Sequence, residues 1–268
     1  MPMTPPLLEA RGLTLQYKTA QHLVTATYRV DLAVRQGDRF VILGPSGCGK
    51  TSLLKAVGGF LKPVEGSITL AGRPISGPGP DRMMVFQEFE QLMPWKTVLG
   101  NVMFPMRVAR SFAAREVRER ALAALAKVNL TEFAGVYPHM LSGGMKMRVA
   151  IARALAMEPE ILLMDEPFAA LDALTRRHMQ QELYELWRML RFTILFVTHS
   201  IEEAALLGSR ILLLSAHPGQ VRAELNAEHL DGQDASDPAF GQLTRRIHDL
   251  LFEPVAPTAA PEPASAQA

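Results

Sequence analysis

The sequence contains the stretch Gly44-Pro45-Ser46-Gly47-Cys48-Gly49-Lys50-Thr51, between an apolar run at residues 40–43 and a stretch rich in helix formers at 52–57. It fits the pattern G-x-x-x-x-G-K-[ST], in the strand-then-helix context in which that pattern forms a phosphate-binding loop. The glycines let backbone N–H groups approach phosphate oxygens, and the helix start adds a partial positive charge. Lys50 is expected to reach the β- and γ-phosphates of a nucleotide, and Thr51 to offer its hydroxyl to Mg²⁺. A glycine-rich turn without a ligand is the alternative, and it leaves the lysine and the threonine unexplained.

Length and charge limit the class of protein. The 268 residues suffice for one large domain, or for a domain with a subdomain. With 28 Lys and Arg against 27 Asp and Glu, the net charge is +1, so no global field favours nucleic acid or an anionic membrane. Because the charges are balanced in this way, we expect no nucleic-acid partner. Cys48 is the one cysteine of the sequence, and a single cysteine excludes an intrachain disulfide.

The sequence shows no targeting or spanning segment. Residues 1–6 lack both the basic start and the apolar core of a signal peptide. The longest apolar runs, at residues 161–164 and 211–214, have the length of strands and are far short of a bilayer span. The protein is expected to be cytosolic unless a partner holds it at a membrane.

Apolar periodicity predicts the fold. Residues 7–34 alternate apolar and polar, which is typical of strands with one solvated face and predicts an antiparallel lobe. Residues 112–128 are rich in helix formers with an apolar face, and predict a helical insertion. After residue 142, helices alternate with apolar strands, which implies a parallel sheet covered on both faces. The helices are expected at 142–156, 174–190 and 201–207, and the strands at 161–164, 193–197 and 210–214.

Two acidic residues follow a predicted buried strand. Asp165 ends the strand beside the phosphate loop, where a nucleotide's metal needs a ligand, so it should hold Mg²⁺ directly or through water. Glu166 should point the other way on an extended backbone and polarise the water that attacks the γ-phosphate. His199, just past the strand at 193–197, could donate a hydrogen bond to the γ-phosphate and hold that base in place. Solvated strand-end acids, and a histidine that caps a helix or fills a crevice, are the alternatives.

A second anion site is predicted at Leu141-Ser142-Gly143-Gly144-Met145. Ser142 can cap the helix that follows, and the paired glycines leave bare N–H groups at its positive end. One chain has no obvious use for two such sites. The stretch therefore suggests that Ser142 grips the γ-phosphate of a nucleotide held by another copy of the chain. A simple capped helix start explains the serine but not the glycines.

The chain resembles the ATP-binding-cassette (ABC) transporter ATPases from about residue 7 to residue 214. The motifs found in the same order are the loop at 44–51 (Walker A), Gln87 after a strand, Leu-Ser-Gly-Gly at 141–144, Asp165-Glu166, Ala170-Leu171-Asp172 and His199. The resemblance implies an α/β P-loop NTPase with a mainly parallel sheet, an N-terminal antiparallel β lobe and an inserted α-helical subdomain. In that family two subunits bind two ATP molecules head to tail and drive a membrane partner between inward- and outward-facing states.

The resemblance also assigns roles to single residues. It implies that Tyr17 stacks on adenine, that Gln87 senses Mg²⁺ and the attacking water, and that Asp172 acts across the dimer. A core position is the alternative for Tyr17. The implied nucleotide-binding residues are Gly44, Pro45, Ser46, Gly47, Cys48, Gly49, Lys50, Thr51, Ser52, Tyr17, Ser142, Gly143, Gly144 and Asp172. The implied metal ligands are Thr51, Gln87 and Asp165, and the implied catalytic residues are Glu166, His199 and Gln87.

Several stretches resemble the nitrate, sulfonate and taurine import ATPases of bacteria. They are Phe86-Gln87-Glu88, Leu92-Met93-Pro94-Trp95, Leu-Ser-Gly-Gly-Met at 141–145 and Leu214-Ser215-Ala216-His217-Pro218-Gly219. The implied partners are a second copy, an integral membrane permease and, indirectly, a solute-binding protein, at the cytoplasmic face of the inner membrane. The apolar residues at 92–95 would suit a groove for a short permease helix, or they could be core.

The resemblance has limits and leaves alternatives. Met145, Met147 and Ala169 depart from the family pattern, and each is expected to remove a possible hydrogen bond at the inter-subunit face. A clamp ATPase that acts on DNA or ribosomes, an importer for another solute and a nucleotide-binding module without hydrolysis are the other functions considered. We expect residues 1–253 to form the ATPase domain, with a helical subdomain at about 88–158. The Pro- and Ala-rich segment at 254–268 is expected to be disordered.

Overall fold

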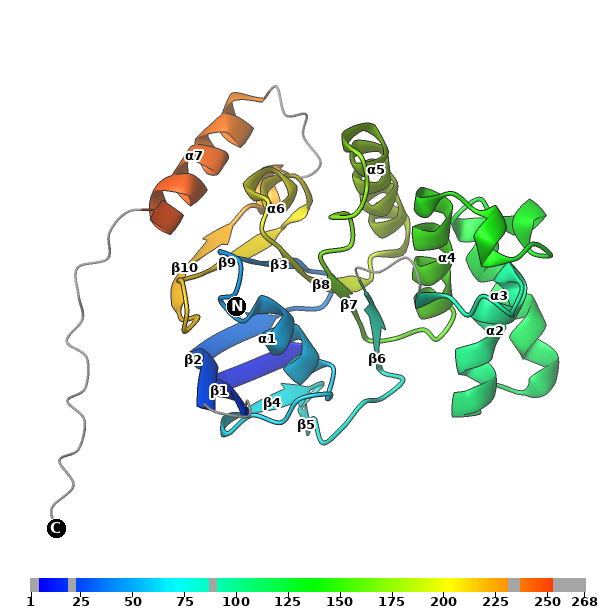
Figure 1. The fold of residues 1–268 in the computed structure, drawn as a ribbon, viewed down its shortest axis with the longest axis horizontal. Coiled ribbons are helices and arrows are strands. Elements are labelled where there is room, and N and C mark those ends of the chain that lie inside the picture. Colours follow the sequence, from blue (N-terminus) through cyan, green and yellow to red (C-terminus); the bar gives the residue numbers. More distant parts are fainter. Residues whose placement is uncertain (1–4, 19–22, 87–90, 231–236, 253–268) are drawn as a thin grey trace, which may run out of the picture.

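The computed structural model describes residues 5–18, 23–86, 91–230 and 237–252, which form two β-sheets and the helices around them (Figure 1). The smaller sheet is antiparallel in the order β2-β1-β4-β5. Its strands are β1 (Leu8–Lys18), β2 (Leu23–Val34), β4 (Glu65–Leu70) and β5 (Arg73–Pro74). The antiparallel lobe predicted from residues 7–34 is therefore confirmed, and β4 and β5 extend it.

The larger sheet has six strands in the order β10-β9-β3-β8-β7-β6. The strands are β3 (Arg39–Leu43), β6 (Arg82–Val85), β7 (Ile161–Asp165), β8 (Thr193–Thr198), β9 (Arg210–Leu214) and β10 (Val221–Asn226). All neighbours pair in parallel except β10, which runs antiparallel to β9. The predicted, mainly parallel sheet is confirmed. It places the ends of β3, β7 and β8 side by side.

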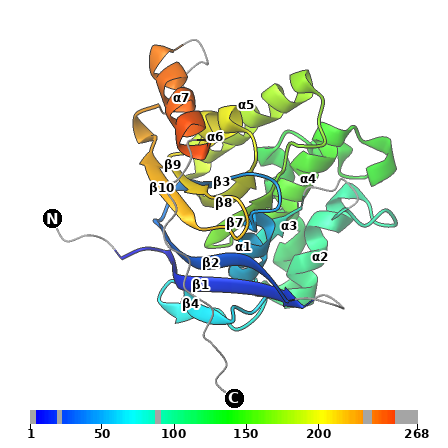
Figure 2. The ribbon, with the colours of Figure 1, turned by 60° about the vertical axis from the view of Figure 1, so that its left-hand side comes forward.

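The helices divide between the two faces of the larger sheet (Figures 1 and 2). Helix α1 (Lys50–Val57) lies between the two sheets, and α5 (Ala173–Leu190), α6 (Ile201–Leu207) and α7 (Pro238–Phe252) cover the other face. Helices α2 (Val98–Ala109), α3 (Ala114–Lys127) and α4 (Gly143–Leu155) form a group at one side. The described residues also form the short 3₁₀ helices η2 (Thr131–Phe133), η3 (Pro138–Met140) and η4 (Glu228–Leu230). None of the described helices is both long and apolar enough to cross a bilayer.

The alternation of side chains along β3 separates two hydrophobic cores. Phe40 and Ile42 belong to the cluster that contains Leu53 of α1 and the antiparallel sheet. Val41 and Leu43 point the other way, into the cluster formed with the helices of the opposite face. A strand buried on both faces has a continuous apolar sequence. The apolar run at residues 40–43 therefore indicates a central strand, and the phosphate loop that follows β3 lies at the centre of the molecule.

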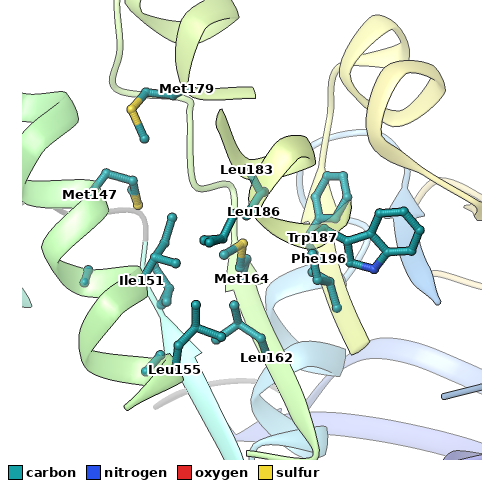
Figure 3. Packing of buried hydrophobic residues seen from close by; sticks show 14 of the residues in the cluster. Met147, Ile151, Leu155, Leu162, Met164, Met179, Leu183, Leu186, Trp187 and Phe196 are labelled. Atoms are coloured by element: carbon teal, nitrogen blue, oxygen red, sulfur yellow. The ribbon is translucent and has the colours of Figure 1, made fainter. Parts of the chain in front are cut away.

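The second core joins α4 to α5 and the sheet (Figure 3). Met147, Ile151 and Leu155 recur at helical spacing on α4, opposite Met179 and Leu183 of α5. Met147 is only 1% exposed. The prediction that Met147 removes a hydrogen bond at the inter-subunit face is therefore wrong. It occupies an apolar position of α4, where methionine fills the core and a polar side chain would have to be desolvated.

The start of β9 is stabilised by a buried ion pair. Arg210 Nη1 lies 2.9 Å from Asp38 Oδ2, and both residues are less than 10% exposed. Arg210 also bonds Glu224 of β10 and the carbonyl oxygen of Ala33. Replacing Arg210 with methionine is expected to lower the free energy of unfolding by about 3 kcal/mol, because Asp38 would stay buried without its partner. Urea denaturation measures this loss.

The matched control for that variant is Arg188→Met. Arg188 lies on an exposed part of α5 and is paired only at 3.7 Å with Glu185. Exposed pairs of this kind contribute at most about 1 kcal/mol. Equal losses in the two variants would show that burial does not set the contribution of the Arg210 cluster.

Candidate functional site

The phosphate loop connects β3 to α1 and is held by its own lysine. Lys50 is 5% exposed, and its Nζ donates to the carbonyl oxygens of Gly44, at 2.9 Å, and Pro45, at 3.0 Å. These two bonds lay the side chain along the loop. They also hold a positive charge beneath the backbone N–H groups at the start of α1, where an anion is favoured.

Glycine is required in this loop for its backbone shape. Gly47 and Gly49 have φ angles of 79° and 94°, a region that residues with a Cβ rarely adopt. A Cβ on Gly49 would lie 2.7 Å from the carbonyl oxygen of Ala26 on β2. The loop therefore takes its curvature from glycine, and it packs directly against the antiparallel sheet.

Two side chains with oxygen atoms, those of Thr51 and Asp165, meet at the end of the phosphate loop. Thr51, in the first turn of α1, donates from Oγ1 to Oδ1 of Asp165 at 2.9 Å. Asp165 is the last residue of β7 and is 8% exposed. Burial raises the pKa of its carboxyl group, and the bond from Thr51 and the charge of Lys55 oppose that shift. Residues 114 positions apart in the chain thus form one site of hard oxygen ligands.

A second pair lies beside the first. Oε2 of Glu166 is 2.9 Å from Nδ1 of His199, the residue after Thr198 at the end of β8. The backbone N–H of Glu166 donates to the carbonyl oxygen of Val197. This bond fixes Glu166 between the carboxyl ends of β7 and β8, and His199 is placed to orient its carboxylate.

The predicted backbone of Glu166 is wrong. The sequence suggested an extended residue, whereas Glu166 has a φ of 42° and lies outside β7, which ends at Asp165. A non-glycine residue with positive φ is uncommon and costs about 1–3 kcal/mol. The separation of Asp165 and Glu166 into two different contacts therefore comes from this turn and not from strand alternation.

A pocket of about 330 Å³ opens over the loop, and its lining combines the phosphate loop with the antiparallel sheet. Tyr17 is 37% exposed there, and its hydroxyl donates to Oγ of Ser52 on α1 at 2.8 Å. The lining residues are Tyr17, Val24, Ala26, Ser46, Gly47, Gly49, Lys50, Thr51, Ser52, Glu166 and His217. The lining thus comes from five separate segments, and three of them carry predicted residues: Tyr17, the phosphate loop and Glu166. The lining residues that sequence reasoning missed are Val24, Ala26 and His217.

The other predicted residues lie elsewhere. Ser142 caps α4, and its side chain accepts from the N–H of Met145 at 3.3 Å. Asp172 caps α5 by accepting from the N–H of Thr175, a bond that lowers the pKa of its carboxyl group. Among the described residues that line the pocket, none comes from the start of α4 or α5. Gln87 lies outside the described residues.

Comparison with known proteins agrees with this geometry. The family model for "ABC transporter" matches residues 28–169, more than half of the chain. The chain is 46% identical to the taurine import ATP-binding protein TauB of Rhizobium johnstonii, over 85% of this chain and 89% of the relative. It is 42% identical to the nitrate import ATP-binding protein NrtD of Synechococcus elongatus, over 83% of each chain.

A third relative and a solved structure extend the comparison. The bicarbonate transport ATP-binding protein CmpD of a Synechocystis species is 40% identical, over 93% of this chain and 90% of the relative. A dimeric, post-hydrolysis structure of the ATP-binding cassette MJ0796 with ADP and Pi is 33% identical, with a TM-score of 0.69, over 82% of this chain and 98% of that one. The chain therefore belongs to the ABC transporter family and is an ATPase.

Proposed function

We propose that this chain is the ATP-hydrolysing subunit of a bacterial importer for a small oxyanion or sulfonate. Relatives whose names specify taurine, nitrate and bicarbonate transport share 40–46% of their residues with it over most of its length. The observation that carries the proposal is that the similar region contains two pairs of polar side chains at the carboxyl ends of β7 and β8. Thr51 pairs with Asp165, and Glu166 with His199, over a glycine-shaped loop.

ATP and Mg²⁺ fit the residues of the pocket. Lys50 and the loop N–H groups would hold the phosphates, and Thr51 and Asp165 would hold Mg²⁺. The fit rests on two hard oxygens 2.9 Å apart, of Thr51 and the buried Asp165, because Mg²⁺ is usually held by one or two protein oxygens together with phosphate oxygens. When bound, the ion neutralises charge on the phosphates. Gln87 remains a proposed further ligand on sequence grounds.

Glu166 is the proposed general base. Its carboxylate lines the pocket and is held by His199, so it can accept a proton from a water that attacks the γ-phosphate. His199 would act by orienting Glu166 and by donating to the phosphate. The ring of Tyr17, fixed by its bond to Ser52, would stack on adenine, which accounts for an aromatic side chain left 37% exposed.

A second copy of the chain would complete the site. Ser142, Gly143 and Gly144 form the start of α4 but do not line the pocket of their own chain. The solved cassettes MJ0796 are described as dimeric. We infer a head-to-tail dimer in which Ser142 and Asp172 of each chain reach the nucleotide of the other. In this arrangement residues 1–253 act as one ATPase domain with a helical subdomain at about 88–158.

The proposed permease contact lies on the helical group. The segment at 92–95 was predicted either to receive a permease helix or to belong to the core. Leu92 is 3% exposed and belongs to the core, whereas Trp95 is 72% exposed and is free for a contact. Beside it, Lys96 lies over the ring of Phe104 on α2, and Val108 is exposed one turn further along. An exposed tryptophan next to apolar side chains is suited to anchor a short helix of a membrane subunit. The chain would thus be held peripherally at the cytoplasmic face of the membrane.

Replacing Trp95 with glutamate is expected to weaken association with the permease by about 30-fold or more, since a buried tryptophan anchor contributes about 2 kcal/mol or more. Affinity is measured with the purified partner permease. ATP turnover of the isolated subunit should not change. Phe252→Ala is the matched control, because Phe252 is a similarly exposed aromatic residue at the far end of α7. Equal affinities in the wild type and the Trp95 variant would contradict the proposed contact.

The solute class is tested in vesicles that contain the permease and the external binding protein. Taurine, nitrate and bicarbonate are added singly inside and outside the vesicles, and ATP hydrolysis is recorded. Stimulation by one of these solutes, with uptake of the same solute, is the expected result. Association with ribosomes or DNA in place of a multi-span membrane protein would reject the transport proposal and favour a clamp ATPase.

A further inference from the structure

We propose that His217 is a further nucleotide-binding residue and that its imidazole hydrogen-bonds the ribose hydroxyls of bound ATP. His217 lines the same pocket as Tyr17 and the phosphate loop, although it follows β9, more than 160 residues after that loop. No motif used above assigns it a role. The inference depends on how the segment at 215–220 is built into the wall of the pocket.

Gly219 anchors this segment to both sides of the pocket. Its N–H donates to the carbonyl oxygen of Ala26, and its own carbonyl oxygen accepts from the N–H of Tyr28, both at 2.9 Å. A Cβ on Gly219 would lie 2.0 Å from the carbonyl oxygen of Cys48 in the phosphate loop. The backbone of the segment is therefore pressed between β2 and the phosphate loop, and only glycine allows that approach.

Hydrogen bonds within the segment fix its shape. Ser215 and Gln220 are paired through the N–H of Ser215 and the carbonyl oxygen of Gln220, at 2.9 Å. Oγ of Ser215 accepts from the N–H of Gln220 at 3.0 Å and donates to the carbonyl oxygen of Pro218 at 3.2 Å. These bonds close the loop and fix the backbone of the residue at its tip. That residue is His217, two positions before the anchor at Gly219.

The chemistry of the pocket indicates what His217 binds. The phosphate loop already supplies Lys50, Thr51 and backbone N–H groups to the pocket, whereas Val24 and Ala26 of β2 give it an apolar wall. The hydroxyl of Tyr17 donates to Ser52. The 215–220 segment joins the apolar wall to the phosphate loop, because it is anchored to Ala26 of the one and to Cys48 of the other. A neutral imidazole can both donate and accept, so it suits the two adjacent hydroxyls of a ribose placed between base and phosphates.

The side chain of His217 is available for such a bond. It is exposed, and within the described ranges it has no hydrogen bond or ion pair to another residue. Because the backbone of the closed loop is already ordered, binding a ligand costs the rotamer freedom of this one side chain and no ordering of the loop. Its substitution should therefore change binding without disturbing the fold.

The experiment compares equilibrium binding of a non-hydrolysable ATP analogue with that of its 2′-deoxy and 3′-deoxy forms. In the wild type, loss of the contacted hydroxyl is expected to weaken binding about three- to tenfold, as for one hydrogen bond. In His217→Ala the ribose form should be weakened by a similar factor, and the deoxy form should show no additional loss. Binding of the analogue to the wild type tests the ATP site itself, and the dependence on the hydroxyls tests His217 alone.

Two controls make the result specific. Gln220→Ala changes an exposed side chain in the same segment and should retain the wild-type preference for the ribose form. Thermal unfolding should be unchanged in both variants. If His217→Ala kept the full preference for ribose, or weakened the ribose and deoxy forms equally in the way that a lost phosphate contact would, the proposal would be overturned.

Discussion

Replacing Glu166 with glutamine is expected to slow ATP turnover by roughly 10²- to 10⁴-fold and to leave ATP binding nearly unchanged. Glutamine has the shape of glutamate and keeps one oxygen that can accept from His199, which lies 2.9 Å from Glu166 in the wild type. It cannot take a proton from the attacking water. Release of inorganic phosphate measures turnover, and calorimetry with ATP measures affinity.

The matched control is Glu202→Gln. Glu202 is an exposed glutamate in the first turn of α6, shortly after His199 in the chain, and it does not line the pocket. Its replacement removes the same charge a few residues after the end of β8, so it corrects for any general electrostatic effect on ATP. Wild-type turnover in the Glu166 variant, or an equal decrease in both variants, would exclude Glu166 as the base.

Much of the fold could be predicted because its central strands are buried on both faces. The apolar runs that became β3, β7, β8 and β9 identified the sheet, and the Ser142 cap identified the start of α4. Helix α2 was missed. It contains Pro105, a residue that normally argues against a helix interior, and Thr97 caps it through the N–H of Gly100. Tertiary packing overrides the local signal there.

Helix α7 was missed for a different reason. It is amphipathic, with Phe240, Leu243 and Ile247 buried at helical spacing, so the periodicity was present in the sequence. Strand β10 before it was missed as well, because Leu225 is its one buried residue and it has no apolar run. Both elements lie at the β10 edge of the larger sheet, where β10 pairs with β9 and α7 packs against these two strands.

The site was predictable where a motif carries its own chemistry, and not where distant segments meet. The loop, Thr51 and Asp165 followed from the sequence, and the structure brings them together. The positive φ of Glu166 depends on its bond to Val197, and the place of His217 depends on the contact of Gly219 with Cys48. These are contacts between residues distant in sequence, and a local pattern does not encode them.

At ATP concentrations that just saturate the wild type, two variants are each expected to lose most of the turnover alone and to restore part of it when mixed. Lys50→Ala removes the charge beneath the phosphate loop and should weaken ATP binding about 10- to 100-fold, as for a lost charge-assisted hydrogen bond. Ser142→Asp keeps a good helix cap, so α4 should remain folded. It places a negative charge where the γ-phosphate of the partner's nucleotide is proposed to bind, and like charges repel there.

The mixture separates a site shared between chains from a site completed within one chain. In a symmetric dimer, each site would combine the loop of one copy with Ser142 of the other. A mixed dimer then has one doubly altered site and one intact site, formed by the loop of the Ser142→Asp chain and the serine of the Lys50→Ala chain. Random pairing makes about half of the dimers mixed, so about a quarter of the wild-type sites should be restored.

Both phosphate release and ATP retained per dimer through gel filtration are recorded in that experiment. Retention reports an intact site even if hydrolysis requires two occupied sites, so a turnover of zero does not by itself decide the outcome. If Ser142 acted on the nucleotide of its own chain, each chain of the mixed dimer would carry one defect in its only site, and mixing would restore neither quantity. Since Ser142 caps α4 and does not line the pocket of its own chain, we expect ATP retention to recover.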